Sequence, residues 1–481
     1  MMDLNYAAAK PEIWLALASM ALLMLGVFRG DGFTKAVAWL SAAALVVTAW
    51  LVMSGTPEQG RILAFNGLFV VDSFGSFMKM LSLLATAVAI VMSLGYAERE
   101  GMMRFELPIL MMISALGMIM MISANDLISL YIGLELQSLA LYVVAAFRRD
   151  TERSTEAGLK YFVLGALSSG MLLYGASMIY GFTGSTSFTM LAQTLGASGQ
   201  PSIGLIIGIV FLCAGLAFKV SAVPFHMWTP DVYEGAPTPI TAFFAAAPKV
   251  AAIALFTRVL IGPFSNLIDQ WQQIIVFISI ASMILGGVAA INQRNIKRLM
   301  AYSSIGNIGY ALVGLAAGTE GGVSGLAIYM AIYIVATIGI FAVILSMRRK
   351  GQMVEEIGDL AGLSHTQPML AYVLAIFMFS LAGIPPFAGF WGKWFVFYAA
   401  IDAGLFGLAV IGVLASVISA FYYIRIIKVM FFDKAGEALD RPENLIRLVA
   451  LASAVVITLG VFVPAPLQAL AKAAASSLFA G

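Results

Sequence analysis

The chain has few charged residues and almost none of the side chains that bind metals. Asp, Glu, Lys and Arg make up 11% of its 481 residues, whereas a soluble domain carries about 25%. The single cysteine, Cys213, excludes an internal disulfide and a cysteine-ligated metal cluster. With His226 and His365 as its only histidines, a multi-histidine metal or haem site is not expected. No GxGxxG or P-loop motif indicates nucleotide binding, and a net charge of +2 gives no reason to expect nucleic acid.

Apolar residues dominate instead. They make up 61% of the chain, and the mean hydropathy is +0.96, so we expect a multi-pass integral membrane protein lying in a lipid bilayer. A transmembrane helix needs about 20 apolar residues. Residues 1–12 lack the basic start and cleavage site of a signal peptide, so the first run should be a retained helix. Fourteen such runs are present, at 11–28, 35–53, 73–95, 105–123, 127–147, 154–181, 202–225, 239–262, 271–292, 297–317, 323–347, 367–402, 405–431 and 445–465.

The loops predict the orientation of these helices. Residues 60–71 alternate weakly around Asn66-Gly67, which is typical of a β-hairpin outside the membrane. Lysines and arginines gather after the odd-numbered helices, so those loops should be cytoplasmic and both termini extracytoplasmic. We expect the polar stretch 348–367 to be an ordinary cytoplasmic loop with a solvated His365. The basic residues after odd-numbered helices are Arg29, Lys35, Arg99, Arg104, Arg148, Arg149, Arg153, Arg294, Lys297, Arg298, Arg348, Arg349, Lys350, Lys434 and Arg441.

Two of the predicted helices contain prolines that should break them. Pro224 interrupts helix 7, and Pro385-Pro386 interrupts the overlong helix 12. Broken helices in two halves of a chain are typical of inverted-repeat transporters. The predicted fold class is an all-α polytopic membrane protein of about 14 transmembrane helices, with helices 4–8 and 9–13 as two inverted five-helix repeats. Residues 1–481 would form one transmembrane domain, divided into 1–104 (helices 1–3 and the hairpin), 105–262 (first repeat), 271–431 (second repeat) and 445–481 (C-terminal helix).

Several charged residues fall inside these helices, where each costs roughly 2.5–3.5 kcal/mol on insertion scales. Glu135 in helix 5 and Lys219 in helix 7 could form a structural ion pair that joins two helices. They could also form a proton-handling pair, because a lysine held between an acid and apolar surroundings can take up and release a proton. The stretch 218–249, which places Lys219 beside the break and Lys249 in the next helix, therefore predicts an ion path.

The other candidates have less specific signals. Lys249 and Lys393 have no acid within one helical turn, and a functional role is favoured over reaching to the membrane surface. For Lys160, beside a basic loop, that rival remains open. His226 could shuttle protons near neutral pH or be a satisfied structural histidine. Lys79 in helix 3 is expected to have a structural or interfacial role, and Glu106, near the start of helix 4, could be interfacial.

Long motifs around these residues resemble the subunit N family of proton-pumping NADH-quinone oxidoreductase, respiratory complex I. The resemblance covers nearly the whole chain, and its longest motif is highly specific. The motifs that carry it are VPFHMWTPDVYEGAPTP at 223–239, APK at 247–249, NIKRLMAYSSI at 295–305, and GIPP at 383–386 followed by Gly389-Phe390 and Lys393.

The resemblance implies an antiporter-like subunit of the bacterial inner membrane that holds no redox cofactor itself. FMN, iron–sulfur clusters and quinone would lie in other subunits, and subunits M and K would be its neighbours in the membrane arm. Glu135 and Lys219 match the family's helix-5 glutamate and helix-7 lysine, and Lys249 and Lys393 match the lysines of helices 8 and 12. The matches at other positions of the polar axis are Lys160 and His226.

The expected function is therefore proton translocation coupled to quinone reduction, with no redox chemistry in this chain. The sequence departs from the family pattern at one point: it has Asn307 in helix 10, near which related subunits often have a histidine. Because asparagine cannot titrate there, a proton path would have to use water or neighbouring hydroxyls. Two alternatives remain at this point: a subunit of a multisubunit Na⁺/H⁺ antiporter, or a structural spacer whose buried charges only hold helices together.

Overall fold

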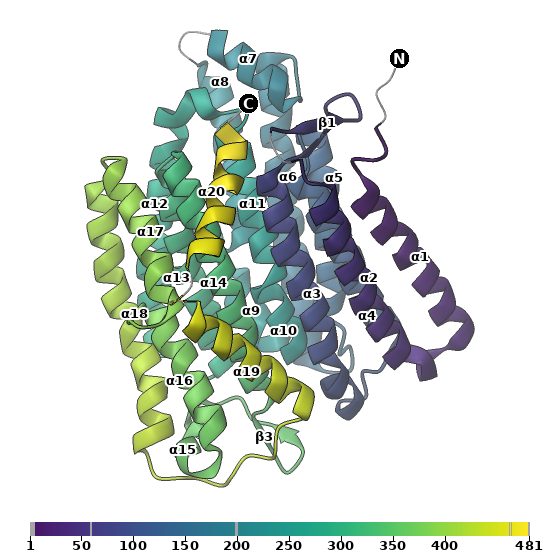
Figure 1. Cartoon of the computed structure of the whole chain (residues 1–481), viewed down its shortest axis with the longest axis vertical. Helices are drawn as coiled ribbons and strands as arrows, with labels where there is room; N and C mark the ends of the chain where they lie inside the picture. Colours follow the sequence, from purple (N-terminus) through teal and green to yellow (C-terminus); the bar gives the residue numbers. More distant parts are fainter. Residues whose placement is uncertain (1–4, 58–59, 198–200, 461, 463, 480–481) are drawn as a thin grey trace.

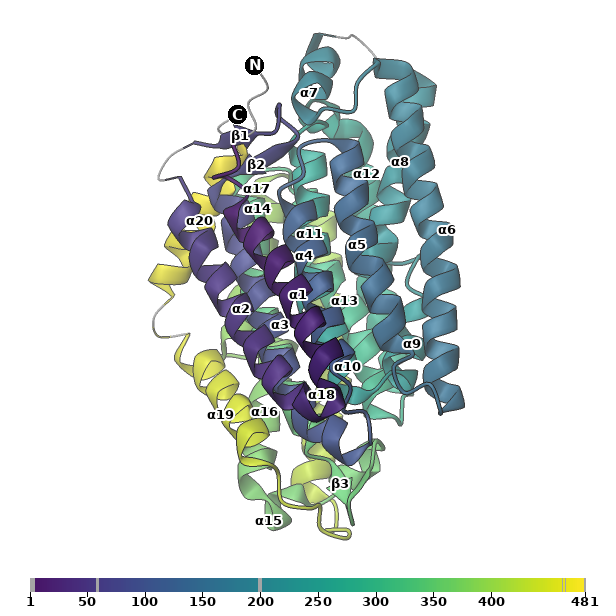
Figure 2. The same cartoon turned by 90° about the vertical axis from the view of Figure 1, so that its right-hand side faces the viewer.

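The computed structural model is a bundle of α-helices that lie side by side (Figures 1 and 2). It describes residues 5–57, 60–197, 201–460, 462 and 464–479. The helices are α1 Lys10–Arg29, α2 Thr34–Gly55, α3 Ser73–Arg99, α4 Glu106–Ile122, α5 Leu127–Ala145, α6 Glu152–Thr183, α7 Phe188–Ala197, α8 Ile203–Val220, α9 Trp228–Gly235, α10 Thr238–Ala245, α11 Ala247–Ile261, α12 Ile268–Ile291, α13 Ile296–Ala316, α14 Glu320–Leu345, α15 Leu363–Thr366, α16 Pro368–Ala382, α17 Ala388–Asp402, α18 Phe406–Phe432, α19 Asn444–Leu459 and α20 Ala465–Phe479.

The lengths and compositions of these helices confirm a polytopic all-α membrane protein. Among the described residues, eleven helical segments are long and apolar enough to cross a membrane. The shorter apolar helix α4 and the pairs α16–α17 and α19–α20 bring the described chain to the fourteen crossings that the sequence predicts. The apolar stretch of α10–α11 is 100% buried inside the protein, and that of α13 is 94% buried. These central helices therefore have no lipid-facing side, and polar groups on them must find partners inside the protein.

Two predicted helices are each divided in the structure. The run 239–262 is split at Ala246 into α10 and α11, because Pro248 lacks the N–H that would continue the helix. The predicted helix 445–465 is wrong at its C-terminal end, since α19 stops at Leu459 and a further helix, α20, follows Pro464. Both breaks occur at prolines inside apolar runs, which hydropathy alone cannot resolve. The short helix α7 was also not predicted.

The predicted hairpin is confirmed. Strands β1 (Ile62–Ala64) and β2 (Phe69–Val71) pair antiparallel. Asn66 and Gly67 both have positive φ, at 57° and 84°. Such a tight turn needs the left-handed region, which asparagine and glycine tolerate best. The position of the hairpin is therefore determined by its turn residues, Asn66 and Gly67.

The basic loops meet at one end of the molecule, as the sequence predicts; we call this the basic end. Loops that follow different odd-numbered helices are tied together there by ion pairs. The stretch 348–367 is not an ordinary loop, because it holds strands β3 (Arg348–Arg349) and β4 (Gln352–Met353), and Arg348 is buried. His365 is exposed, as expected. The ion pairs that join the loops are Lys35–Glu98, Arg104–Asp31, Arg99–Glu443, Arg148–Glu100, Arg348–Glu100 and Arg153–Glu355.

The opposite end carries the hairpin and α7, and the first turn of α1 and last turn of α20 lie on that side (Figure 1). Helices α4, α5 and α6 pack in sequence, as α12, α13 and α14 do. Because α4 starts at the basic end and α12 at the opposite end, the matching helices run in opposite directions (Figures 1 and 2). Each set continues into a broken helix, α8–α9 and α16–α17. This arrangement agrees with the predicted inverted repeats.

A buried ion pair fastens α3 to α11 near the opposite end. Arg258 donates to both oxygens of Asp72 at 2.7 and 2.8 Å, and Asp72 also accepts from Gly75 N at 2.7 Å. Removing one charge of a buried pair costs about 3–5 kcal/mol, whereas an exposed pair contributes about 0–1 kcal/mol. We expect Asp72→Asn to lower the thermal unfolding temperature of the detergent-solubilised protein by several degrees. Asp31→Asn, at the exposed pair with Arg104, is the control and should change it little; equal shifts for the two variants would contradict this.

Candidate proton path

Two interrupted helices bring backbone carbonyls into the middle of the bundle. Helix α8 ends at Val220, where Ser221 takes a left-handed conformation (φ 63°), and the chain resumes as α9 seven residues later. Helix α16 ends at Ala382, with Gly383 left-handed (φ 81°), before α17 begins at Ala388. The three prolines predicted to interrupt these helices, Pro224, Pro385 and Pro386, lie in the breaks, so this part of the prediction is confirmed. The last carbonyls of α8 and α16 lack helical partners and are free to accept from side chains.

Glu135 and Lys219 are brought together in the first half, but a hydroxyl lies between them. Lys219 Nζ donates to Ser138 Oγ at 2.8 Å and lies 3.5 Å from Ser169 Oγ. Ser169 in turn donates to Glu135 Oε1. No direct ion pair joins the two residues within the described chain. The predicted pair is therefore a three-membered chain of carboxylate, hydroxyl and ammonium, with the OH of Tyr142 3.4 Å from Lys219 Nζ.

Lys249 on α11 is one of the largest fully buried side chains, at 1% exposure. Its Nζ donates to Val220 O, the last carbonyl of α8, at 3.2 Å, and lies 5.8 Å from the ring centre of Tyr233 on α9. Within the described residues, no carboxylate lies within ion-pair distance of this ammonium. The negative end of the α8 dipole and the ring face stabilise its charge in place of an acid.

Lys393 on α17 repeats this arrangement in the second half. Its Nζ donates to Ala382 O, the last carbonyl of α16, at 3.2 Å, and to Ser416 Oγ on α18 at 2.7 Å. It lies 4.5 Å from the ring centre of Tyr310 and is 6% exposed. It too has no carboxylate partner in the described part of the chain. Both buried lysines therefore cap the free end of a broken half-helix.

A cluster of hydroxyl groups and one amide fills the space beside Lys393. Asn307 donates to Ser303 O at 2.7 Å and to Tyr423 OH at 3.2 Å, and it accepts from Tyr329 OH at 2.7 Å. Tyr333 OH donates to Ser304 Oγ at 2.8 Å. A cavity of about 10 Å³, the size of one water molecule, is lined by Asn307, Tyr329, Tyr333, Ser380 and Lys393 among others. Asn307 is thus surrounded by groups that can donate and accept protons.

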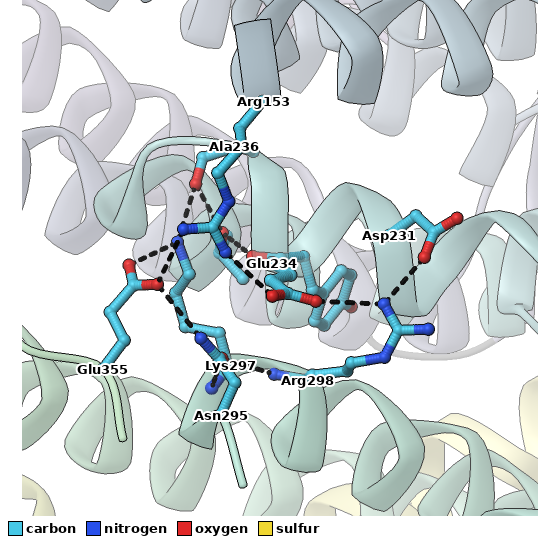
Figure 3. Close-up of polar contacts among 10 residues, drawn as sticks. Arg153, Asp231, Glu234, Ala236, Asn295, Lys297, Arg298 and Glu355 are labelled. Carbon is cyan, nitrogen blue, oxygen red and sulfur yellow. Dashed lines mark hydrogen bonds and ion pairs between the residues drawn. The ribbon is translucent and has the colours of Figure 1, made fainter. Parts of the chain in front are cut away.

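Lys160 is placed away from these groups, at the basic end. Its Nζ pairs with Glu156 at 2.7 Å and with Asp231 of α9 at 2.8 Å, and 41% of its side chain is exposed. It belongs to an ionic cluster around α9, part of which Figure 3 shows. Arg298 pairs with both Asp231 and Glu234, at 2.7 and 3.0 Å. Asp231 and Glu234, both on α9, therefore find their basic partners on other helices.

His226 lies in the break between α8 and α9 and is not in contact with the buried lysines in any described interaction. Its Nδ1 is buried with no hydrogen-bond partner among the described residues, and its neighbour Met227 is 58% exposed. The histidine side chain is itself partly exposed, so it lies toward the outer side of the break. Of the remaining charged residues, Lys79 forms a buried ion pair with Glu12 at 2.6 Å, which fits the structural one of the two roles expected for it. Glu106 is exposed.

Comparison with known proteins decides the family. A family model described as "NADH:quinone oxidoreductase/Mrp antiporter, TM" matches residues 124–419. NADH-quinone oxidoreductase subunit N of Paramagnetospirillum magneticum is 58% identical over 99% of this chain and 98% of its own length. The chain belongs to the subunit N family of NADH-quinone oxidoreductase. It is thus a membrane subunit of a proton-translocating, multisubunit oxidoreductase.

Solved structures agree with membership in the subunit N family. A chain of respiratory complex I from Thermus thermophilus with bound aureothin matches with a TM-score of 0.82 and 31% identity, over 96% of this chain and 99% of that one. A chain of the Mrp complex from Dietzia sp. DQ12-45-1b has a TM-score of 0.84 at 22% identity, over 99% of this chain and 98% of its own. At that identity the second likeness shows the fold alone, so it gives no support to the sodium antiporter alternative.

Several buried polar residues of this subunit N family member could not be predicted from the sequence. Lys297 was counted only as a basic loop residue, yet it is 3% exposed and pairs with Glu355 at 2.8 Å. Ser169 and Ser138 were not singled out either, since a serine in an apolar helix has no distinctive signal. For Lys297, the available signal is its place as the first residue of the predicted helix 297–317, where the side chain can turn either toward solvent or toward the protein.

Proposed function

We propose that this chain translocates protons across the bacterial inner membrane through Glu135, Lys219, Lys249 and Lys393. Quinone reduction, with FMN and iron–sulfur clusters, takes place in other subunits of the complex. The basic end faces the cytoplasm under the positive-inside rule, so that both termini are extracytoplasmic. Subunits M and K are proposed as its neighbours in the membrane arm. The chain itself contributes proton transfer and no redox chemistry.

One observation carries this proposal: Lys249 and Lys393 are buried beside carbonyl groups and aromatic rings, with no acid in ion-pair distance among the described residues. A lysine kept only to join helices would be expected to have a carboxylate partner, because a buried unpaired charge is costly. The partial charge of a helix end compensates the ammonium incompletely. Burial of an ammonium group without an acid therefore fits a residue that gains and loses its charge, as a proton carrier does.

The first half supplies the group that changes charge. Ser169 can pass a proton between Glu135 and Lys219, because a hydroxyl both donates and accepts. Closer approach of Glu135 favours protonated Lys219, and its retreat favours release. The released proton moves to Lys249 and then through the Tyr–Ser–Asn cluster to Lys393. Lys160 and His226 are proposed to assist from the edges of this path, Lys160 at the cytoplasmic side.

Paired neutral replacements separate this function from a purely structural one. We expect Lys219→Ala to lower NADH-driven proton pumping sharply in an assembled complex. The double variant Glu135→Gln/Lys219→Met removes both charges and keeps the side-chain volumes close to the original. If the pair carries protons, the double variant pumps as poorly as the single one. If the pair only joins helices, the double variant assembles and pumps normally, and that result would overturn the proposal. Pumping is measured as acidification of sealed vesicles on addition of NADH.

A further inference from the structure

The half-helix α9 is held at the basic end by three basic residues from two other helices, α6 and α13. Asp231 accepts from Lys160 and Arg298, at 2.8 and 2.7 Å. Glu234 accepts from Arg153 at 2.8 Å as well as from Arg298. Figure 3 shows Arg153 of α6 and Arg298 of α13 reaching the acidic residues of α9. An eight-residue helix has little stability of its own, so its position depends on contacts with its neighbours, these ion pairs among them.

Lys297 adds a contact of a different kind. Its ammonium donates to Ala236 O, at the C-terminal end of α9, at 3.1 Å, and it pairs with Glu355 at 2.8 Å (Figure 3). The lysine is 3% exposed and lies in the first turn of α13. It therefore connects the end of α9, in the first half of the chain, to Glu355, between β4 and η3 (Ile357–Leu360), in the second half.

Glu355 is itself held firmly. Its side chain accepts from Asn295 Nδ2 at 3.2 Å and lies 3.8 Å from Arg153. Its backbone carbonyl accepts from Ile296 N at 2.8 Å. Burial alone would raise the pKa of Glu355, but Lys297, Asn295 and Arg153 together hold that pKa below its usual value. The carboxylate therefore remains charged at neutral pH.

The inner end of α9 contacts the proposed proton path. Trp228 Nε1 donates to Phe218 O, beside Lys219, at 3.1 Å. The indole stacks on Tyr161, with ring centres 4.3 Å apart and an angle of 7° between the planes. One turn further along, Tyr233 places its ring 5.8 Å from Lys249 Nζ. The placement of α9 thus sets the surroundings of both lysines.

From these contacts we propose that Lys297 and Glu355 are positioning residues for proton transfer. They fix the outer end of α9 across the two halves of the chain, and α9 in turn holds Trp228 against the end of α8 and Tyr233 against Lys249. Neither residue carries the transferred proton. The proposal rests on the proposed function, because it assigns α9 to the placement of Lys219 and Lys249.

The test compares Glu355→Gln and Lys297→Met with two matched variants in the assembled complex. Lys297→Arg keeps the charge and donors, and Glu356→Gln makes the same change at the exposed neighbouring residue. A displacement of order 1 Å at a reacting group can cost about 100-fold in rate. We expect Glu355→Gln and Lys297→Met to lower pumping per assembled complex about tenfold, with Lys297→Arg and Glu356→Gln near wild type. Hydrogen exchange of the backbone amides of residues 228–235 should speed up about tenfold in the two impaired variants.

The outcomes separate the possible accounts. Unchanged pumping and unchanged exchange in Glu355→Gln and Lys297→Met overturn the positioning role. The same conclusion follows if the isosteric Glu355→Gln fails to assemble, or if it lowers the amount of complex without lowering pumping per complex, because both indicate structural support only. Lys219→Ala is run alongside: normal pumping in that variant contradicts the proposed function, whereas the exchange of the α9 amides tests the Lys297–Glu355 link independently of it.

Discussion

Replacing Lys249 by methionine is expected to lower NADH-driven proton pumping about a hundredfold while the complex still assembles. Insertion scales put a central lysine at roughly 2.5–3.5 kcal/mol, and each 1.4 kcal/mol corresponds to about tenfold in rate. Without Lys249, a proton that crosses this point has no ammonium group to carry its charge. A barrier raised by a similar free energy slows proton transfer by about a hundredfold. Methionine is an unbranched, flexible side chain that can fill the space of lysine. Because Lys249 has no carboxylate partner among the described residues, the change leaves no uncompensated acid behind.

The measurement is acidification of sealed vesicles per assembled complex, with Lys35→Met as the control. Lys35 forms an exposed pair with Glu98, and 58% of its side chain is exposed, so its loss should leave pumping unchanged. An assembled Lys249→Met complex that pumps at the control rate would remove Lys249 from the path. Loss of assembly would instead indicate that the lysine–carbonyl contact with Val220 holds α11 to α8.

Lys393→Met is expected to have the next largest effect, a loss of pumping of about tenfold or more. Lys393 occupies the same kind of position as Lys249, at the free carbonyl end of a broken helix, but it has more polar neighbours. Ser416 accepts its second hydrogen bond, and the hydroxyl cluster around Asn307 lies beside it across a small cavity. These groups give a proton alternative partners, so the loss should be smaller than at Lys249.

Ser416→Ala is the matched variant for this second prediction. It removes one hydrogen bond from the ammonium, worth roughly 1.5–3 kcal/mol to a charged group at most, and keeps the lysine itself. Pumping should fall less than in Lys393→Met when both are measured in the same vesicles. A larger loss in Ser416→Ala than in Lys393→Met would mean that the serine, and not the lysine, is required at this point.

The local features of the fold could be predicted from the sequence because short stretches determine them. Apolar runs gave the number of crossings, and Pro224 and Pro385-Pro386 gave the two breaks. Asn66-Gly67 gave the hairpin. The split at Ala246 and the extra helix α20 were missed because a proline in an apolar run can either begin a new helix or bend the existing one. Hydropathy does not distinguish these cases.

The partners of the candidate site residues could not be predicted, because they come from distant parts of the chain. Lys249 donates to Val220 O, 29 residues away, and Lys393 to Ala382 O, across a break of its own helix. The sequence does not show which backbone carbonyls lack a helical partner and can accept from a side chain. A serine in an apolar helix is no more distinctive, and Ser169 lies between Glu135 and Lys219. The sequence therefore predicted a pair of charged residues, whereas the structure has a carboxylate, a hydroxyl and an ammonium group in a row. Lys297 could not be recognised as a buried residue, because the sequence does not distinguish it from the solvated basic residues that follow other odd-numbered helices.

The most direct test of proton transfer through the buried groups is the number of protons moved per NADH oxidised in vesicles that hold the assembled complex. It is measured for the wild type, Lys219→Ala and the double variant Glu135→Gln/Lys219→Met. If Lys219 carries protons in exchange with Glu135, both variants show strongly reduced pumping, and neutralising Glu135 as well does not restore it. Wild-type pumping by an assembled Lys219→Ala complex, or its recovery in the double variant, would contradict the account.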